Sequence, residues 1–578
     1  MSKVFAGALQ CCRRRLLSVP TLRSRPSTPR PLSPTVSRAI PAFACARLTH
    51  TATDRTASSA AMAPTYEDAV SLLNSTQTGY KLIEERRKAG ITLDMTDPIG
   101  HMKTWLGYIG HTAEDLDRLN IVHVAGTKGK GTTCAFTNAI LERYRLRREQ
   151  GDATAGPTKI GLYTSPHLVA VRERIRINSK PISTELFTKY FFEVWQAFEA
   201  SATKAGADAA IKPSYFRFLT LLSFHVFLRE GVDAAIYEVG VGGELDATNV
   251  FVHPAATAIS TLGIDHVDTL GATLDKIAWH KAGIFKAGSP AFTIPQEALA
   301  MPVLASRAAE RSASLQVLDP AAYRQQLAVV KLTPAEEFQR KNAALAISLA
   351  ATVLRRLGVD EDTMAGVATQ GGALPAEFVY GLENVVWRGR CETKVTGRQR
   401  WYLDGAHNEQ SLEVACQWFG REVREDNQAS RAASDATKTK PAVNILVFNQ
   451  QSTRDAIGLL RTVHKTVSSF NEDGSFTYAV FCTNVTYKNN SYKVDFVNKN
   501  VDPAALKSLE LQQTLAAEWR TISPGTKAVV AMPTIEDAVD YVRQIEGGDI
   551  DVRVLITGSF HLIGGALTIL EEGEDFAS

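Results

Sequence analysis

Hydrophobic and polar positions follow two different patterns in the first two thirds of this 578-residue chain. Short apolar runs with β-favouring residues predict strands, and they lie at 121–125, 159–168, 234–243 and 255–263. Segments with apolar residues three or four positions apart predict helices, at 186–200, 214–231 and 338–358. Strands that alternate with helices predict a doubly wound parallel sheet, with its ligand site at the carboxyl ends of the strands.

A second alternating region follows a stretch punctuated by glycine and proline. Its short apolar runs predict a smaller, Rossmann-like α/β domain, and they lie at 392–396, 398–408, 443–450, 477–484 and 552–565. We therefore predict an α/β protein with a large doubly wound parallel-sheet domain at 62–371, a linker at 372–386 and a second domain at 387–578. The low-complexity stretch that ends at Pro441 and the polar segment 487–500 are predicted surface inserts.

Residues 1–61 differ in composition from everything that follows them. They hold ten Lys or Arg and one acid, Asp54, so this segment carries +9 and the rest of the chain −6. An Arg-rich, Ser-rich segment almost without acids is typical of a mitochondrial transit peptide, although a generic disordered tail has a similar composition. Met62 stands where the globular pattern starts, and initiation there predicts a second, cytoplasmic form. The acidic body gives no electrostatic basis for binding nucleic acid.

Cysteines and apolar runs exclude other classes of protein. Four of the seven cysteines lie outside residues 1–61, far apart and with no C-x-x-C spacing, which argues against a disulfide framework or a zinc site. The largely apolar segment Phe218–Leu228 is long enough for a core helix only. We expect no transmembrane segment.

The segment Ile121–Thr133, IVHVAGTKGKGTT, predicts a strand, a glycine-rich turn and a helix N-terminus. Backbone N–H groups and the helix dipole make such a turn an anion site. Lys130 would place its charge on the terminal phosphates of a nucleotide, and the Thr132 hydroxyl would lie near a metal ion. The turn departs from the ordinary P-loop because Gly131 separates lysine from threonine. A plain connecting turn is the alternative interpretation.

Two polar residues follow neighbouring predicted strands. Ser165 and Glu238 could supply the hard oxygen ligands that Mg²⁺ prefers. A buried carboxylate such as Glu238 is costly unless it is paired or metal-bound, so a structural salt bridge is the alternative for it. Ser165 could equally cap a turn.

Further motifs follow in a fixed order along the chain. They are YTSPHLVAVRERIRIN (163–178), YEVGVGGELDATN (237–249), GIDHVDTLGATLDKIAWHKAGIFK (263–286), WRGR (387–390), DGAHN (404–408) and TGSFHLIGG (557–565). Together with the glycine-rich turn, this order and spacing is similar to that of the folylpolyglutamate synthases, within the larger group of ATP-dependent Mur-type amide ligases. The resemblance covers nearly all of 62–578.

The resemblance implies roles for residues that carry no clear signal alone. The cofactor-binding set for ATP is Gly126, Thr127, Lys128, Gly129, Lys130, Gly131, Thr132, Asn342, Arg390 and Asp404. The Mg²⁺ ligands are Thr132, Ser165, Glu238 and His266, although an isolated histidine such as His266 is more often a hydrogen-bonded structural residue. The catalytic set is Lys130, Lys281, Asp404 and His407. Ser559 and His561 would help to bind the incoming amino acid.

Lys281 carries the most unusual implied role. In the family that the chain resembles, this lysine is carbamylated, and a neutral amine is needed to capture CO₂, so burial must lower the lysine pKa. An ordinary lysine near a helix end is the alternative. Trp279 and His280 stand where the family often has an acid, Arg388 stands where it often has proline, and Ser452 departs from the usual TGDRD, although Arg454-Asp455 is retained.

We expect ATP-dependent addition of L-glutamate to tetrahydrofolates through γ-carboxyl amide bonds, by way of an acyl phosphate. ATP and Mg²⁺ are the expected cofactors, with a monovalent cation such as K⁺ as a further candidate. The resemblance also implies a monomer. The leader and Met62 predict mitochondrial and cytoplasmic forms, and we expect peripheral association of the former with mitochondrial membranes. Dihydrofolate synthase, which adds the first glutamate to dihydropteroate, is the alternative. A bacterial-type cell-wall ligase shares the metal and phosphate motifs, but the predicted transit peptide argues against it. A P-loop ATPase or nucleotide-binding switch would explain the glycine-rich turn but not Lys281 together with DGAHN.

Arg172 and Arg174 alternate with other residues in VRERIRIN. They could attract an anionic tail of the substrate, or form a solvated strand face.

Overall fold

The structure is a computed structural model of the whole chain. It describes residues 63–79, 85, 97–152, 155–204, 212–367, 372–433, 442–450, 455–470, 475–489, 494–497, 499, 503–545 and 550–571. Residues 1–62, with the predicted transit peptide and Met62, lie outside this set, as do Ser452 and Arg454. Ala63–Ser578 forms one compact unit.

Eight strands of the described residues form one sheet in the first domain. In spatial order they are β4 (Lys180–Pro181), β3 (Ile175–Ile177), β2 (Ile160–Tyr163), β5 (Ala234–Glu238), β1 (Val122–Ala125), β6 (Ala256–Ile259), β7 (Pro290–Thr293) and β8 (Ser314–Val317). The strands from β2 to β8 in this order pair in parallel, whereas β3 and β4 are antiparallel. The predicted doubly wound parallel sheet is confirmed, with an antiparallel edge.

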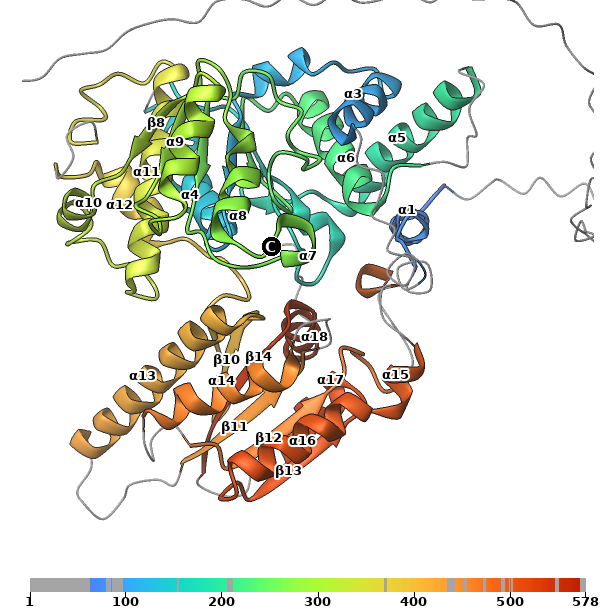
Figure 1. Cartoon of the computed structure of the whole chain (residues 1–578), viewed down its shortest axis with the longest axis vertical. Helices are drawn as coiled ribbons and strands as arrows, with labels where there is room; N and C mark the ends of the chain where they lie inside the picture. The colour runs from blue at the N-terminus through green and yellow to red at the C-terminus, as the bar shows by residue number, and fades with distance from the viewer. Residues whose placement is uncertain are drawn as a thin grey trace, which may run out of the picture. The chain divides into compact units, whose positions relative to one another are not determined.

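Helices cover both faces of this sheet (Figure 1). One face packs on α4 (Lys130–Glu149), α11 (Glu337–Arg356) and α12 (Ala376–Glu383). The other packs on α1 (Tyr66–Ser75), α3 (Pro98–Tyr108), α5 (Thr184–Lys204) and α6 (Tyr215–Glu230). Shorter helices complete the domain, namely η1 (Glu114–Leu119), η2 (Val171–Arg174), α7 (Val267–Leu270), α8 (Leu274–Lys281), η3 (Ala282–Ile284), α9 (Met301–Glu310) and α10 (Pro320–Gln326).

The second sheet belongs to the carboxyl-terminal part of the chain. Its described strands are, in spatial order, β13 (Ala528–Met532), β12 (Tyr478–Cys482), β11 (Ala442–Phe448), β14 (Asp551–Thr557), β10 (Gln399–Asp404) and β9 (Glu392–Thr396). All pairs are parallel except β9 with β10. The predicted second α/β domain is therefore confirmed.

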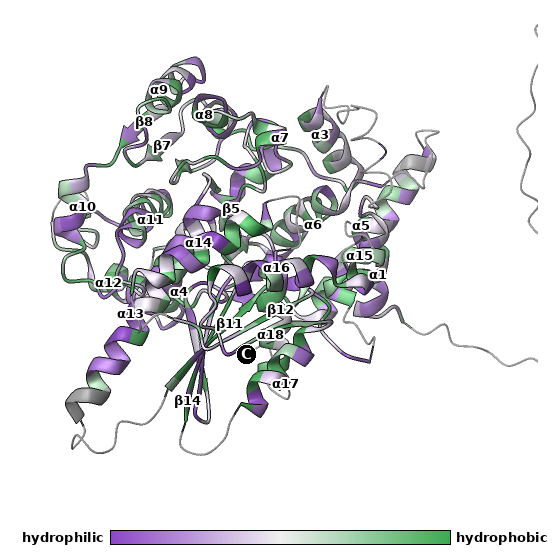
Figure 2. Cartoon of the chain, turned by 60° about the horizontal axis from the view of Figure 1, so that its bottom comes forward, coloured by the Kyte–Doolittle hydropathy of each residue, from purple (hydrophilic) through white to green (hydrophobic). Residues whose placement is uncertain are grey.

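Alternate residues of these strands build two hydrophobic cores. Tyr402 and Leu446 face the first core, and their neighbours Trp401 and Ile445 face the second. The helices are α13 (Glu409–Ala433), α14 (Ala456–Ser468) and α16 (Glu510–Ile522) around the first core, α17 (Ile535–Gln544) and α18 (Phe560–Leu570) around the second, and the short η5 (Val494–Phe496) and α15 (Pro503–Ser508). Figure 2 shows the strands β11 and β12 largely green and helices such as α13 banded with purple, as this amphipathic layering requires.

Three segments differ from the simplest expectation. The predicted linker 372–386 contains α12, whose Phe378 and Leu382 are buried in the first domain's core. The low-complexity stretch before Pro441 starts inside α13, which runs on to Ala433. No helix of the described residues is long and apolar enough to cross a membrane.

Candidate functional site

The glycine-rich turn connects β1 to α4 as predicted. The backbone N–H groups of Thr127 and Lys128 both donate to the carbonyl oxygen of Thr261, at 3.0 Å each, which fixes the turn against the end of β6. Ser260 Oγ donates to the Lys128 carbonyl at 2.7 Å. The helix then begins at Lys130, so the N–H groups of its first turn and its dipole point into the space above the turn. This arrangement suits an anion.

Gly129 holds the turn in a shape that other residues resist. It has φ +82°, and a Cβ at this position would lie 2.1 Å from Oδ1 of the buried Asn342 on α11. This conformation lets the glycine-rich turn contact α11 at Asn342, one of the residues predicted to bind ATP. Asn342 Nδ2 accordingly donates to Gln339 Oε1 at 3.2 Å and leaves Oδ1 beside the turn.

The substitution Gly129→Ala should both destabilise the protein and weaken binding of ADP. Strain from the left-handed backbone costs about 1–2 kcal/mol, and the clash with Asn342 adds to it. Gly110→Ala is the matched control, because Gly110 has φ +81° with nothing within 4 Å of its Cβ position. Thermal unfolding and calorimetric titration of ADP measure the two effects. Equal losses of stability and of ADP affinity in the two variants would contradict the role given to the contact between Gly129 and Asn342.

The carboxyl ends of β1, β2 and β5 meet beside the turn. Pairing sets Val124 opposite Glu238, and the Ser165 backbone N–H donates to Glu238 Oε2 at 2.9 Å. Burial raises the pKa of Glu238, and the positive charge of Lys130 opposes this shift. Ser165 and Glu238 therefore lie together at the predicted edge of the sheet. No carboxylate–arginine ion pair of Glu238 is formed within the described residues, so the structural salt bridge is not observed there.

A cavity of about 510 Å³ opens above these residues. The predicted residues that line it are Thr127, Lys128, Gly129, Lys130, Gly131, Thr132, Ser165, Glu238, Asn342, Arg390, Asp404 and His407. Both sheets therefore contribute to one cleft. Lys128 Nζ also contacts Gln410 Oε1 on α13, and burial lowers the pKa of Lys128 to about 8.

His266 does not lie with this group. It is an exposed residue at the N-terminus of α7, with φ +52°, and the cleft is lined instead by its neighbour Asp265. The geometry therefore gives no support to His266 as a metal ligand. In the part of the chain that the structure describes, no three His, Cys, Asp or Glu side chains cluster to hold a metal. Oxygen donors at this cleft are hydroxyl groups and single carboxylates.

Lys281 lies under the glycine-rich turn, at the end of α8. Its side chain is buried, 3% exposed, and Nζ donates to the carbonyl oxygen of Gly126 at 2.8 Å. Burial lowers its pKa to about 7, with a further contribution from the charge of Lys130. The predicted low lysine pKa is thus present, and it has the predicted cause. Lys281 does stand at the end of a helix, as the alternative interpretation has it, but its side chain is buried.

On the opposite wall, β10 ends at the buried Asp404. Its Oδ1 lies 3.7 Å from Arg390 Nη1, and its Oδ2 accepts from the Cys391 backbone N–H at 2.8 Å. Burial raises the pKa of Asp404, and Arg390 opposes the shift. His407 Nδ1 lies 2.8 Å from the Gly405 carbonyl. Since a carbonyl only accepts, Nδ1 carries the hydrogen in this contact.

Ser559, His561, Arg172 and Arg174 lie outside the lining of this cleft. Ser559 is the N-terminal cap residue of α18, and Arg174 Nε donates to His167 Nδ1 at 2.9 Å. Burial, and then the charge of Arg174, lowers the pKa of His561. Arg174 is thus a buried interior residue, and the predicted solvated strand face does not apply to it.

Sequence reasoning missed two residues of the cleft. Trp387 is the first residue of WRGR, and its ring atom Cζ2 lies 3.3 Å from the position of a Gly131 Cβ. Arg176 follows Arg172 and Arg174 at the strand period, and its guanidinium lies 6.0 Å from the Trp387 ring. The extra glycine in the turn therefore makes room for an indole from the second domain. The period-two spacing of the arginines does not identify Arg176, because Arg172 and Arg174 share that spacing and lie outside the cleft.

The residues that depart from the family pattern have their own partners. Arg388 forms ion pairs with Glu392, at 3.0 Å, and with Glu571, which join the WRGR segment to the end of α18. The guanidinium of Arg307 lies 4.5 Å from the ring of Trp279. Asp455, which the family pattern retains, caps α14 by accepting from the Gly458 N–H at 2.9 Å.

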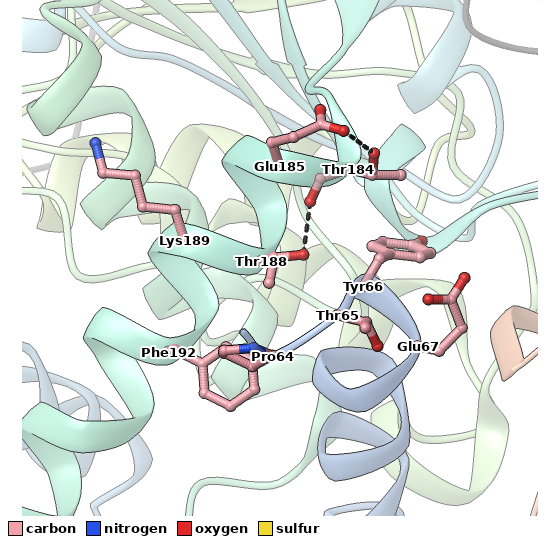
Figure 3. Close-up of a pocket in the computed structure, with 9 residues that line it drawn as sticks. All are labelled: Pro64, Thr65, Tyr66, Glu67, Thr184, Glu185, Thr188, Lys189 and Phe192. Atoms are coloured by element: carbon pink, nitrogen blue, oxygen red, sulfur yellow. Dashed lines mark hydrogen bonds between the residues drawn. The ribbon is translucent and has the colours of Figure 1, made fainter. Parts of the chain in front are cut away.

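A separate open hollow lies between the start of α1 and α5 (Figure 3). Its lining shares no residue with the cleft. Thr184 Oγ1 donates to Glu185 at 2.9 Å and Thr188 Oγ1 donates to the Thr184 carbonyl at 2.7 Å, while Figure 3 shows Lys189 extending away from them. Both hydrogen bonds therefore join residues within the first turns of α5.

Comparison with known proteins gives one consistent answer, although no family model matches the chain. The chain is 49% identical over 520 residues to the folylpolyglutamate synthase of Neurospora crassa, across 89% of this chain and 93% of that protein. It is 40% identical over 512 residues to folylpolyglutamate synthase of Saccharomyces cerevisiae, across 88% and 87%.

Solved structures share the fold. Folylpolyglutamate synthase of Mycobacterium tuberculosis, complexed with ADP and AMPPCP, has a TM-score of 0.57 at 23% identity, over 81% of this chain and 96% of that one. E. coli FolC in complex with DHPP and ADP has a TM-score of 0.52 at 21% identity, over 83% and 99%. From the close relatives, which match almost along their whole length, we conclude that the chain belongs to the folylpolyglutamate synthase family.

Proposed function

We propose that this protein is an ATP- and Mg²⁺-dependent ligase that adds L-glutamate to tetrahydrofolate and its one-carbon forms through γ-carboxyl amide bonds. The observation that carries the proposal is a single cleft lined by the glycine-rich turn (called the phosphate turn below), by Glu238, and by Asp404 and His407 of the second domain. The names of relatives at 40% and 49% identity support the substrate class.

The reaction needs a carboxylate to become a good leaving group. An oxygen of the folate γ-carboxylate attacks the γ-phosphorus of ATP, ADP leaves, and an acyl phosphate forms. The neutral amino group of glutamate then attacks the acyl carbon, phosphate leaves with one former carboxylate oxygen, and the amine loses a proton. Positioning and neutralisation of phosphate charge supply most of the catalysis in such transfers.

The residues of the first domain suit the phosphate part of this work. The N–H groups at the start of α4 and the ammonium of Lys130 would hold the triphosphate. The hydroxyls of Thr132 and Ser165, with the carboxylate of Glu238, form a set of hard oxygen donors that fits Mg²⁺ completed by phosphate and water. Mg²⁺ bound there would offset the phosphate charge. A monovalent cation site remains a prediction.

Lys281 fits carbamylation. Its buried amine has a pKa lowered to about 7, so a large fraction is neutral at physiological pH and can add to CO₂. The carbamate nitrogen keeps one N–H, which can still donate to the Gly126 carbonyl. The resulting carboxylate would lie next to the phosphate turn, where it could assist a second metal ion.

Residues of the second domain would close over the reacting groups. His407, with Nδ1 turned to the Gly405 carbonyl, leaves Nε2 for a phosphate oxygen. Arg390 is held by Asp404 and by the face of Phe560, at 4.2 Å, and would contact ATP. Asn342, which lies beside Gly129, would contact the adenine of ATP, as the family resemblance implies.

The product assay separates this proposal from dihydrofolate synthase. The full chain would be incubated with ATP, Mg²⁺ and glutamate, and with either tetrahydrofolate or dihydropteroate, and the products weighed by mass spectrometry. A ladder of additions on tetrahydrofolate supports the proposal. A single addition on dihydropteroate alone would assign the chain to the alternative.

The composition of 1–61 supports a mitochondrial form, and Met62 a cytoplasmic one. Sequencing of the N-terminus from both compartments tests this, and a single shared N-terminus would contradict it. Monomeric state and peripheral membrane association are part of the same proposal and rest on the resemblance alone.

A further inference from the structure

A second cavity of about 900 Å³ adjoins the cleft. We call it the side cavity; it lies between α4, the β3–β4 hairpin and the segment 380–388. The residues that line both it and the cleft are Leu168, Glu173, Arg176, Trp387 and Arg388. These side chains therefore lie at the boundary between the two spaces.

Two cations of the side cavity have no acidic partner. Within the described residues, neither Arg143 nor Lys180 forms an ion pair with a carboxylate. The guanidinium of Arg143 lies 4.0 Å from the ring centre of Tyr380, and its buried Nε has no hydrogen-bond partner there. Arg143 is half-buried, and an anionic group beside it could accept the hydrogen bond that its Nε does not make within the described residues.

The acids of the side cavity are all engaged. Glu142 pairs with Arg145 at 2.8 Å, and Glu571 pairs with Arg388 and Lys394. Glu173 accepts the backbone N–H groups of residues 168, 169 and 170, at 2.8–3.0 Å. Ion pairs and hydrogen bonds thus engage these acids, and Arg176 and Arg388 also have carboxylate partners. Among the described residues, Arg143 and Lys180 are the cations of the cavity that form no ion pair.

The cavity also offers a hydrogen-bond acceptor. Asn138 on α4 is 6% exposed, and its Nδ2 donates to Ser179 Oγ at 2.8 Å. Its Oδ1 has no partner within the described residues. A ligand that carries both anionic groups and N–H donors would complete this set.

We propose that the side cavity receives the γ-glutamyl tail of substrates that already carry several glutamates. Each residue of such a tail has one α-carboxylate and one amide N–H, which match the two cations and the Asn138 acceptor. The tail would pass Trp387 and Arg176, so that its terminal γ-carboxylate reaches the phosphate turn. This inference rests on the proposed function and concerns which chain lengths the enzyme elongates.

The test compares substrates with one and with five glutamates. In the double variant Arg143→Ala/Lys180→Ala, KM for the pentaglutamate should rise about tenfold, as expected for the loss of charge-assisted hydrogen bonds. KM for the monoglutamate should stay within about twofold, because the reacting centre is intact. Free penta-γ-glutamate, used as the probe, should inhibit the parent protein and not the variant. The single variant Arg143→Lys keeps the positive charge, so its KM for the pentaglutamate should stay close to that of the parent protein.

The control variants are Lys189→Ala and Arg356→Ala. Lys189 lines the hollow of Figure 3, and Arg356 is exposed at the end of α11, so each removes a charge elsewhere. Equal changes in KM for both substrates, or the same change in the controls, would overturn the inference. Absence of any ligation by the parent protein would instead contradict the proposed function.

Discussion

Replacing Lys130 with alanine should lower kcat/KM for ligation by about 10³-fold, which is the range for loss of one preorganised group that stabilises a transferring phosphoryl group. Lys130 is the first residue of α4 and lines the cleft beside Glu238. Its charge is the largest influence that opposes the burial-raised pKa of Glu238. The variant therefore loses a phosphate contact and also makes ionisation of Glu238 harder.

Steady-state kinetics with ATP and a folate substrate measures this effect. Lys103→Ala serves as the control, because Lys103 is an exposed lysine of α3 that does not line the cleft. Circular dichroism and thermal unfolding should show both variants folded. A Lys130→Ala enzyme with kcat/KM near that of the parent would refute the phosphate role.

The second large effect concerns Lys281. Replacement with alanine should reduce kcat by about 10²–10³-fold, because it removes the carboxylate that a carbamate would place by the turn. Formate added to this variant should recover part of the activity, since a small carboxylate fits the space left by the side chain. Intact mass measured at neutral pH with bicarbonate should show one added CO₂ in the parent protein and none in the variant.

The pH dependence of Lys281 has a definite sign. With a folded pKa of about 7, the amine is protonated below that pH and neutral above it, so carbamylation and activity should rise as pH increases through 7. The amine's ordinary value is 10.5, so the unfolded chain binds more protons between about 7 and 10.5. Before carbamylation, this group therefore makes stability increase with pH across that window. Lys281→Met should abolish that dependence. Full activity in CO₂-free buffer would contradict the role.

The alternation of strands and helices was predictable because each helix must bury its apolar face against a parallel sheet, whose central strands are buried on both faces. Val122 and Val124 of β1 and the apolar face of α11 belong to the same core, and their periodicities differ as a strand and a helix require. The position of the phosphate turn was equally predictable. A parallel sheet brings strand ends to one edge, and this places Glu238 beside Ser165.

Contacts between distant segments were not predictable. The polar segment 487–500 has no periodicity, yet its Asp495 accepts from the Tyr66 hydroxyl at 2.6 Å, and Asn74 Nδ2 donates to the Val494 carbonyl at 2.7 Å. Likewise, nothing in WRGR indicates that Trp387 packs on Gly131. Such contacts depend on how the two domains pack against each other, and a single sequence carries no local signal for that packing.

His266 illustrates a different limit. The motif around it places the backbone near the cleft, but the neighbouring Asp265 faces the cavity and the histidine is exposed. A one-residue difference at a left-handed turn decides which side chain points inward. Motif spacing alone does not resolve that choice.

The central claim is that this cleft joins ATP to a carboxylate before the amide forms. The most direct measurement uses a folate substrate whose γ-carboxylate carries oxygen-18, incubated with the full chain, ATP, Mg²⁺ and glutamate. We predict that one labelled oxygen appears in inorganic phosphate for each amide bond made, as an acyl phosphate requires. Amide formation with no label in the phosphate would contradict the mechanism and the roles assigned to the phosphate turn.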